Sequence, residues 1–162
     1  MSFRIVRSVL VAITLVVAGC ASEPSQTQTL SEIAVYDFDG QPDLIVSEGR
    51  PLVINFFAET CVACVTEMPA FELVHLEVAD RVDFIGVSED ATAVAGRRIA
   101  EETGITYRAV WDADGTAATQ LRAGLLPTTV FVHADGTVAR VHLGALSADD
   151  LRAEISDLRT EV

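Results

Sequence analysis

Lysine is absent from the chain, and the basic residues are scarce. The 11 basic residues are all arginine, and 24 acidic residues outnumber them, so that the formal charge is −13. No run of basic residues offsets this charge anywhere along the 162 positions. A surface of this sign repels nucleic acid phosphates and anionic lipid headgroups. The composition therefore excludes nucleic-acid binding.

Histidine and cysteine, which supply most zinc ligands, occur only three times each. A zinc site needs four ligands, or three and a water, yet the chain has a single CxxC and its histidines (His75, His133 and His142) show no ligand spacing. Covalent haem attachment needs a histidine directly after the second cysteine, where this chain has Val65. The sequence therefore indicates no metal site and no cofactor.

The first 19 residues have the features of an export signal. Two arginines precede an apolar stretch, Val9 to Ala18, which fits a signal peptide and is short for a membrane span. The sequence that ends it, Val17-Ala18-Gly19-Cys20, resembles the processing box of bacterial lipoproteins. This resemblance implies cleavage before Cys20 and lipid chains on it, which would anchor the protein to the extracytoplasmic face of the cell membrane. The alternative is an uncleaved anchor helix with an incidental cysteine.

The remaining chain divides into a linker and one domain. Residues 20–31 are polar and rich in Ser, Thr and Gln, which predicts a flexible tether. Residues 32–162 contain no internal repeat, and their length and apolar content suit a single core. We therefore expect a signal peptide over residues 1–19, a tether over 20–31 and a domain over 32–162.

Strand and helix patterns alternate within the predicted domain. The apolar run Pro51–Ala58 is typical of a central strand that is buried on both faces. Alternation that ends in a hairpin at Asp135-Gly136 and a final helix predicts an α/β fold. We expect a central mixed sheet with helices on both faces, preceded by a short N-terminal β extension. The expected strands are 33–38, 43–47, 51–58, 82–88, 108–111, 128–133 and 138–143, and the expected helices are 61–78, 91–103, 116–122 and one capped by Ser147.

The motif Cys61-Val62-Ala63-Cys64 follows the buried strand and begins the first predicted helix. A helix N-terminus carries partial positive charge and free backbone N–H groups, so a thiolate there is stabilised. Cys64 lies about one turn along, within reach of Cys61. One cysteine can therefore attack a substrate disulfide and the other can resolve the mixed disulfide. We expect Cys61 to be the nucleophile, because it is nearer the helix end and the solvent, and Cys64 to be the resolving thiol.

Two segments resemble extracytoplasmic thioredoxin-like proteins of the TlpA, ResA and DsbE type. They are residues 55–70, which contain both cysteines, and residues 126–132, LPTTVFV. The resemblance implies a thioredoxin-like fold and thiol-disulfide exchange with exported cysteine-containing proteins, such as apocytochrome c. It also implies a membrane or extracytoplasmic partner that recycles the pair. At the second segment it implies a cis-proline, Pro127, that faces the redox pair, with neighbouring backbone at Leu126 that binds the substrate chain.

The chain departs from this family at positions near the cysteines. Thr60 stands where family members usually have Trp. Asn55 stands where cytoplasmic thioredoxins place a buried Asp, as is common in the TlpA branch, so a carboxylate that handles protons must come from elsewhere. Glu89, at the end of the next central strand, is the candidate, and Glu59 is a weaker one. The alternative for Glu89 is a solvated loop acid beside Asp90.

Other functions remain open from the sequence. Cys64-Val65-Thr66-Glu67 faintly resembles peroxiredoxins but lacks their activating Pro and Thr, so a peroxidase is one alternative. A non-enzymatic metal carrier or redox-sensing module is another. A purely structural disulfide gains little stability from so short a loop. The direction of electron flow, as a reductant or an oxidant of client proteins, is open as well.

Overall fold

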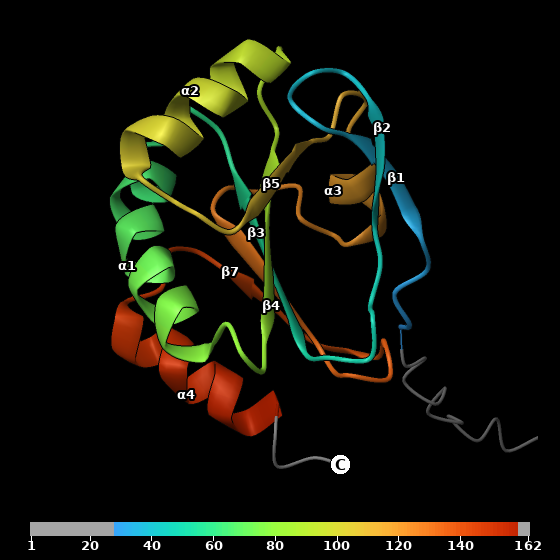
Figure 1. Ribbon diagram of the computed structural model, residues 1–162, viewed down its shortest axis with the longest axis vertical. Helices are drawn as coiled ribbons and strands as arrows, with labels where there is room; N and C mark the ends of the chain where they lie inside the picture. The colour runs from blue at the N-terminus through green and yellow to red at the C-terminus, as the bar shows by residue number, and fades with distance from the viewer. Residues whose placement is uncertain (1–27, 159–162) are drawn as a thin grey trace, which may run out of the picture.

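Seven strands form one mixed sheet, in the order β2-β1-β5-β4-β3-β6-β7, in the computed structural model, which describes residues 28–158 (Figure 1). Four helices complete the fold and confirm the predicted fold class. The strands are β1 (Ile33–Tyr36), β2 (Pro42–Ile45), β3 (Leu52–Phe57), β4 (Asp83–Ser88), β5 (Arg108–Trp111), β6 (Thr128–Val132) and β7 (Val138–Leu143). The helices are α1 (Val62–Val78), α2 (Ala93–Thr103), α3 (Thr116–Gln120) and α4 (Ala148–Leu158).

The strand directions bring distant parts of the chain to one end of the sheet. Strands β3, β4 and β5 are parallel, and Phe57, Ser88 and Trp111 stand in one row across them. Strand β6 is antiparallel to β3 and begins at Thr128, which pairs with Phe56. The residues that follow β3, β4 and β5 and those that precede β6 therefore meet at this end. We call it the carboxyl end of the sheet.

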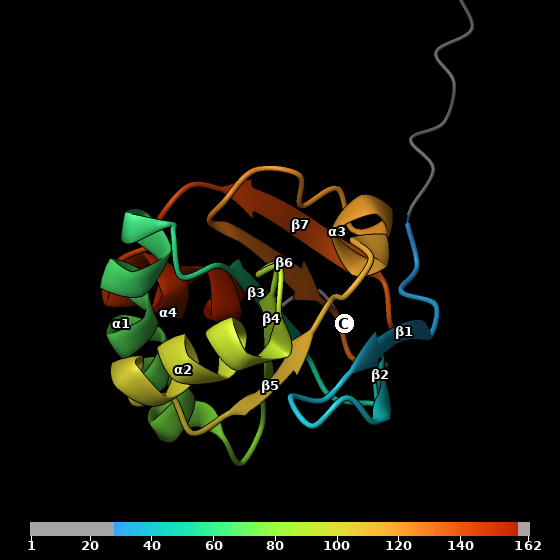
Figure 2. The same cartoon turned by 90° about the horizontal axis from the view of Figure 1, so that it is seen from above.

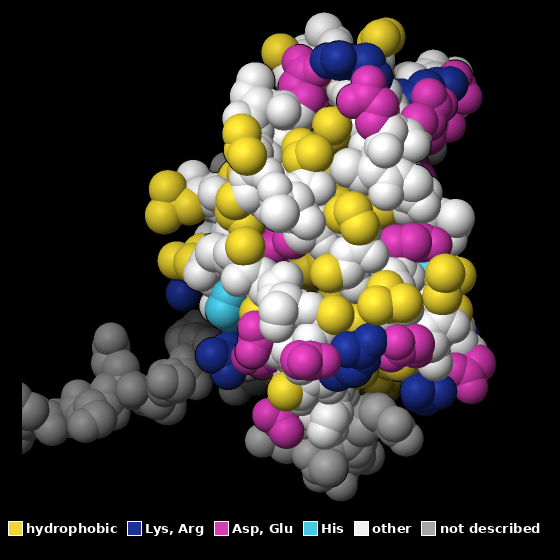
Figure 3. Space-filling model, turned by 90° about the vertical axis from the view of Figure 1, so that its left-hand side faces the viewer, with side chains coloured by type: hydrophobic (Ala, Val, Ile, Leu, Met, Phe, Trp, Pro, Cys, Tyr) yellow, Lys and Arg dark blue, Asp and Glu magenta, His cyan; other side chains and the backbone are white. Residues whose placement is uncertain are grey.

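Helices cover both faces of the sheet, as predicted. Helices α1, α2 and α4 lie on one face and α3 lies on the other (Figures 1 and 2). Side chains alternate along β3: Ile54 and Phe56 pack with α3, whereas Val53 packs with α1 and α4. On the outer side of α1, α2 and α4, hydrophobic side chains gather in the middle of the surface and charged ones gather toward its two ends (Figure 3).

The described domain begins slightly earlier than the predicted boundary at residue 32. Thr29 forms a β-bridge with Thr137, and the Leu30 amide donates a hydrogen bond to the Gly136 carbonyl at 2.7 Å. Residues 28–30 of the predicted tether therefore lie against the β6–β7 hairpin. The predicted signal peptide, Cys20 and the rest of the tether lie outside the described residues. Within residues 28–158, no helix has both the length and the apolar character that a membrane span requires.

Helix caps explain which predicted helix ends are correct and which differ from the structure by one or two residues. Helix α1 begins one residue later than predicted, because Cys61 is its N-cap. Helix α2 begins two residues later, because the Thr92 hydroxyl accepts the Ala95 N–H at 3.3 Å and caps the helix there. The predicted cap of α4 is confirmed, since the Ser147 hydroxyl accepts the Asp150 N–H at 3.2 Å. Gly104 ends α2 in the left-handed conformation, at φ 72°.

Gly96 of α2 lies directly on Ser88 of β4, which generates a stability prediction. A Cβ at position 96 would lie 2.3 Å from Ser88 Oγ and 2.7 Å from Ser88 Cβ. We expect Gly96→Ala to lower the free energy of unfolding by about 1–2 kcal/mol, because this overpacking outweighs the helix propensity of alanine. Gly124→Ala is the control, since a Cβ there meets no heavy atom within 4 Å. Denaturant unfolding of both variants checks this, and wild-type stability of Gly96→Ala would contradict it.

Candidate active site

The two cysteines of the motif form a disulfide with unequal access to solvent. Cys61 and Cys64 are bonded, with their Cα atoms 5.3 Å apart. Cys64 is fully buried, whereas Cys61 is partly exposed. An external thiol therefore reaches the sulfur of Cys61 first. This asymmetry matches the expectation that Cys61 is the attacking residue and Cys64 the resolving one.

The sulfur of Cys61 lies at the positive end of α1. Cys61 is the N-cap residue, and its Sγ accepts the Cys64 N–H at 3.2 Å. The first turn of α1 contains no acidic side chain to offset the helix dipole. In the reduced protein, this backbone N–H and the dipole would both stabilise a Cys61 thiolate.

The predicted cis-proline is present and lies at the same end of the sheet. The Leu126–Pro127 peptide bond is cis. Pro127 directly precedes β6, and its carbonyl accepts the Gly144 N–H at 2.9 Å. Leu126 and Cys61 both pack against one small buried cluster, which consists of Phe57, Cys64, Met68 and Ile99. The structure thus brings Leu126 and Pro127 together with the redox pair.

A buried carboxylate, Glu67, lies one helical turn beyond Cys64, and the sequence reasoning missed it. Its side chain is only 4% exposed. The Asn55 Nδ2 group donates to Glu67 Oε1 at 2.9 Å, and the Leu146 amide donates to Oε2 at 2.9 Å. Burial raises the pKa of Glu67 from its ordinary value of 4.5 to about 7, although both hydrogen bonds act in the opposite direction. Asn55, a predicted supporting residue, therefore acts by holding Glu67.

A signal for Glu67 was present in the helix pattern. Residues three and four positions apart share a helix face, and Glu67 falls on the buried stripe of α1, formed by Cys64, Met68, Phe71, Val74 and Val78. An acidic residue on an otherwise apolar stripe is rarely buried without a partner. The Cβ atoms of residues so spaced are about 5–6 Å apart, so Glu67 is a close neighbour of Cys64.

Glu89 lies at the carboxyl end of the sheet. The structure does not support the alternative interpretation of Glu89 as a freely solvated loop acid. Its amide donates to the Phe57 carbonyl at 2.8 Å, and its side chain is partly buried. Burial, the adjacent Asp112 carboxyl group and the negative charge of Asp90 all raise the pKa of Glu89, which together bring it to about 8. Glu89 is therefore a second acid that can hold a proton near neutral pH at this end of the sheet.

Glu59, the weaker candidate for the carboxylate that handles protons, differs from Glu67 and Glu89 in its contacts. Its carboxylate forms an ion pair with Arg98 of α2, and its side chain is 29% exposed. Thr60, which replaces the family tryptophan, is exposed beside it. Glu59 therefore lies on the rim of the site with its charge paired, which is a poor arrangement for proton transfer.

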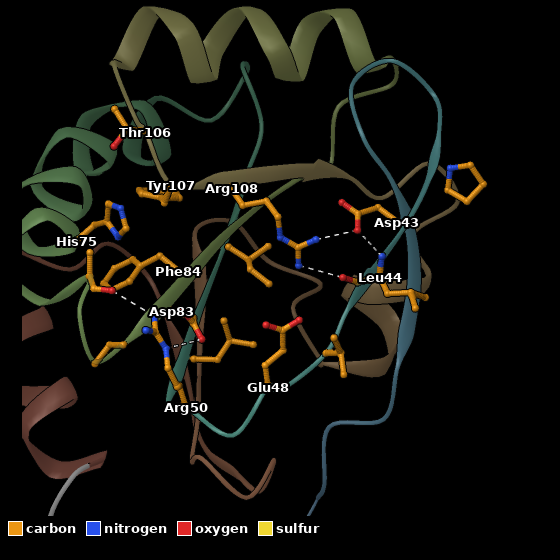
Figure 4. Close-up of a pocket in the computed structure, with 16 residues that line it drawn as sticks. Asp43, Leu44, Glu48, Arg50, His75, Asp83, Phe84, Thr106, Tyr107 and Arg108 are labelled. Carbon is orange, nitrogen blue, oxygen red and sulfur yellow. Dashed lines mark hydrogen bonds and ion pairs between the residues drawn. The ribbon is translucent and has the colours of Figure 1, made fainter.

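A hollow of about 750 Å³ lies at the opposite end of the sheet (Figure 4). Four of its charged side chains form ion pairs, Arg50 with Asp83 and Arg108 with Asp43. His75 lines it and packs edge-on against Phe84, with ring centroids 5.3 Å apart. Because Asp83 and Arg108 begin β4 and β5, this hollow is remote from the disulfide, and we assign it no part in the redox chemistry.

Comparison with known proteins identifies relatives of this chain. The model of the AhpC/TSA family matches residues 30–141. The thiol-disulfide oxidoreductase ResA of Oceanobacillus iheyensis is 29% identical over 112 residues, which cover 68% of this chain and 58% of that protein. The soluble secreted antigen MPT53 of Mycobacterium tuberculosis is 27% identical over 113 residues, covering 68% of this chain and 65% of the antigen. The chain thus spans a little over half the length of these relatives.

A solved structure has a similar fold. The structure of MTB DsbF in its mixed oxidized and reduced forms is 26% identical, covers 78% of this chain and 94% of that one, and superposes with a TM-score of 0.71. The family match covers most of the chain, and its range includes the disulfide at the start of α1 and the cis bond before Pro127. The chain therefore belongs to the AhpC/TSA family, and it is similar to proteins named as thiol-disulfide oxidoreductases of the ResA and DsbE type.

Proposed function

We propose that this protein exchanges disulfides with exported cysteine-containing proteins, through Cys61 as the attacking residue and Cys64 as the resolving one. A lipid on Cys20 would hold it to the extracytoplasmic face of the membrane. The observation that carries the exchange chemistry is the unequal exposure of the disulfide, with a fully buried Cys64 and a partly exposed Cys61 at a helix N-terminus. The relative MPT53 is named a soluble secreted antigen, which supports export, and the sequence around Cys20 supports the anchor.

The exchange takes place in two steps. When the protein acts as a reductant, the Cys61 thiolate attacks a client disulfide, forms a mixed disulfide and releases one client thiolate. Cys64 then attacks the Cys61 sulfur, which breaks the mixed disulfide, releases the second client thiolate and closes the Cys61–Cys64 bond. Two electrons pass to the client, and a redox partner returns them. The same steps in reverse oxidise a client dithiol.

Proton transfer in the second step is assigned to Glu67. The Cys64 thiol is buried, so it must lose its proton to a nearby group before it attacks. Glu67 is one helical turn away, and its pKa of about 7 suits a base that works near neutral pH. Asn55 and the Leu146 amide hold its two oxygens in place.

Trapping tests the roles of the two cysteines. Cys64→Ser should accumulate mixed disulfides with client proteins through Cys61, because the variant can attack but cannot resolve. Non-reducing electrophoresis of extracts from the native host measures these adducts. Cys61→Ser is the matched control and should form none. Failure of Cys64→Ser to trap any client would contradict a role in exchange with exported proteins.

The role of Glu67 predicts a dependence of the exchange rate on pH. In the wild type, the single-turnover rate of the resolving step should rise as the pH passes about 7, where Glu67 loses its proton. Glu67→Gln should lower this rate at pH 8 by at least about tenfold and remove the inflection near pH 7. Glu102→Gln, at an exposed position on α2, is the control and should behave as the wild type. An unchanged profile in Glu67→Gln would exclude Glu67 as the base.

Glu67 also predicts a dependence of stability on pH. Its pKa is higher in the folded protein than the ordinary 4.5, so the folded state binds the proton more tightly than the unfolded state. The free energy of unfolding of the oxidised protein should therefore fall as pH rises from about 4.5 to 7, by about 3 kcal/mol from this group. Glu67→Gln should lose this part of the dependence in urea unfolding at pH 4 and pH 8. An identical slope in both proteins would contradict the burial argument.

The anchor is tested at Cys20. In the native host, the wild type should incorporate a radiolabelled fatty acid and partition with membranes, because two or more acyl chains give stable attachment. Cys20→Ala should lose the label and leave the membrane fraction. A Cys20→Ala variant that loses the label but stays with the membranes would show that the N-terminal segment, rather than a lipid on Cys20, anchors the protein.

The alternative functions make different predictions for the same variants. A peroxidase would consume peroxide through Cys64, so activity that survives Cys61→Ser but not Cys64→Ser would replace the exchange proposal. The full burial of Cys64 argues against this reading. A metal carrier would bind copper or zinc stoichiometrically when reduced and would show no insulin-reduction or RNase-refolding activity.

A further inference from the structure

The turn that carries Cys61 is tied to a distant part of the chain. Between the end of β3 and the start of α1, the Cys61 amide donates to the Ala58 carbonyl at 3.0 Å. The Glu59 amide, two residues before Cys61, donates to Asp90 Oδ1 at 3.0 Å. Asp90 follows β4 and is 31 positions away in the sequence. A single carboxylate thus connects the nucleophile turn to the neighbouring strand.

Asp90 is itself firmly held. It is 8% exposed, and its Oδ2 accepts the Ser88 hydroxyl at 3.0 Å, while its amide donates to Ser88 Oγ at 3.2 Å. Its carbonyl accepts the indole N–H of Trp111 at 2.8 Å. Ser88 is fully buried, and α2 packs onto it at Gly96. The Asp90 carboxylate therefore cannot move without disturbing β4, β5 or α2.

We propose that Asp90 is a positioning residue for Cys61, in that its buried carboxylate fixes the Glu59 amide and, through the turn, the place of the Cys61 sulfur at the N-terminus of α1. This inference rests on the proposed role of Cys61 as the attacking residue. A carboxylate bound to a backbone N–H is a charge-assisted hydrogen bond and is stronger than a neutral one. The hydrogen bond between Asp90 and the Glu59 amide therefore restrains the turn more than the hydrogen bond between the Cys61 amide and the Ala58 carbonyl does alone.

The position of Cys61 Sγ affects its reactivity because the interactions that stabilise its thiolate act only over a short distance. The Cys64 N–H lies 3.2 Å from Cys61 Sγ, and the helix dipole acts mainly within the first turn. A looser turn would therefore lower the thiolate fraction of reduced Cys61. The negative charge of Asp90 acts in the opposite direction, because like charges disfavour a thiolate. The other ionisable groups at this end of the sheet are Glu59, which is paired with Arg98, and the acids Glu89 and Asp112.

The position of the turn and the charge of Asp90 affect the Cys61 thiolate in opposite directions, so two Asp90 variants can distinguish them. Asp90→Asn keeps an oxygen that accepts the Glu59 N–H but removes the charge, whereas Asp90→Ala removes both. In reduced full-length protein, iodoacetamide alkylation of Cys61 is followed from pH 5 to 9 by peptide mass spectrometry. We expect Asp90→Ala to lower the rate at pH 7 about tenfold and to move the profile to higher pH, and Asp90→Asn to stay within about twofold of the wild type.

Asp135→Ala is the matched control. Asp135 Oδ1 accepts the Thr137 N–H at 2.8 Å in the β6–β7 turn, so this variant also removes a carboxylate that holds a backbone amide, but at the far end of β6. Its alkylation profile should equal that of the wild type. If Asp90→Ala does not fold, Ser88→Ala removes one support of the same carboxylate and should lower the rate by about twofold to threefold.

Three results would overturn the proposal. Equal acceleration in Asp90→Asn and Asp90→Ala would show that Asp90 acts by charge. A wild-type profile in folded Asp90→Ala would leave Asp90 a purely structural role, as would a wild-type profile in Ser88→Ala where Asp90→Ala does not fold. Alkylation of Cys64 ahead of Cys61 in the wild type would instead remove the proposed function itself, which distinguishes the two failures.

Discussion

The hydrogen bond from the Cys64 amide to the Cys61 sulfur, at 3.2 Å, is the contact on which the rest of the site depends. It places one sulfur at the positive end of α1 and leaves the other in the core. Thiol-disulfide exchange needs this difference in exposure, because one sulfur must react with the client and the other must release it. The parallel strands β3 and β4 and the antiparallel β6 then bring Glu89, Asp90 and the cis-proline to the same end of the sheet.

Buried polar groups connect the elements around this contact. Glu67 joins α1 to β3 through Asn55 and to the segment before α4 through the Leu146 amide. A buried carboxyl group with a raised pKa costs stability above neutral pH, so a fold selected for stability alone would favour an apolar residue there. We interpret Glu67 as a group that the fold retains for proton transfer to and from Cys64.

Much of this architecture could be predicted from the sequence, and the exceptions share a physical cause. The alternation of strands and helices, the order of the two cysteines and the cis-proline follow from local patterns or from the family resemblance. The stripe of α1 predicts the burial of Glu67, but its partners, Asn55 of β3 and the Leu146 amide, meet α1 only in the folded protein. The contact of Asp90 with the Glu59 amide spans 31 positions and depends on strand register, which no local pattern encodes. The pairing of residues 28–30 with the β6–β7 hairpin is long-range in the same way.

The most direct test of a redox-active pair is the equilibrium of the purified protein with glutathione buffers. The fraction of Cys61–Cys64 disulfide would be measured by acid quenching and mass spectrometry. We expect one reversible two-electron transition in the folded protein. Its midpoint also reports direction, with values near about −270 mV favouring a reductant and values near about −120 mV an oxidant. A disulfide that stays closed until the protein unfolds would contradict the account, because the bond would then be structural.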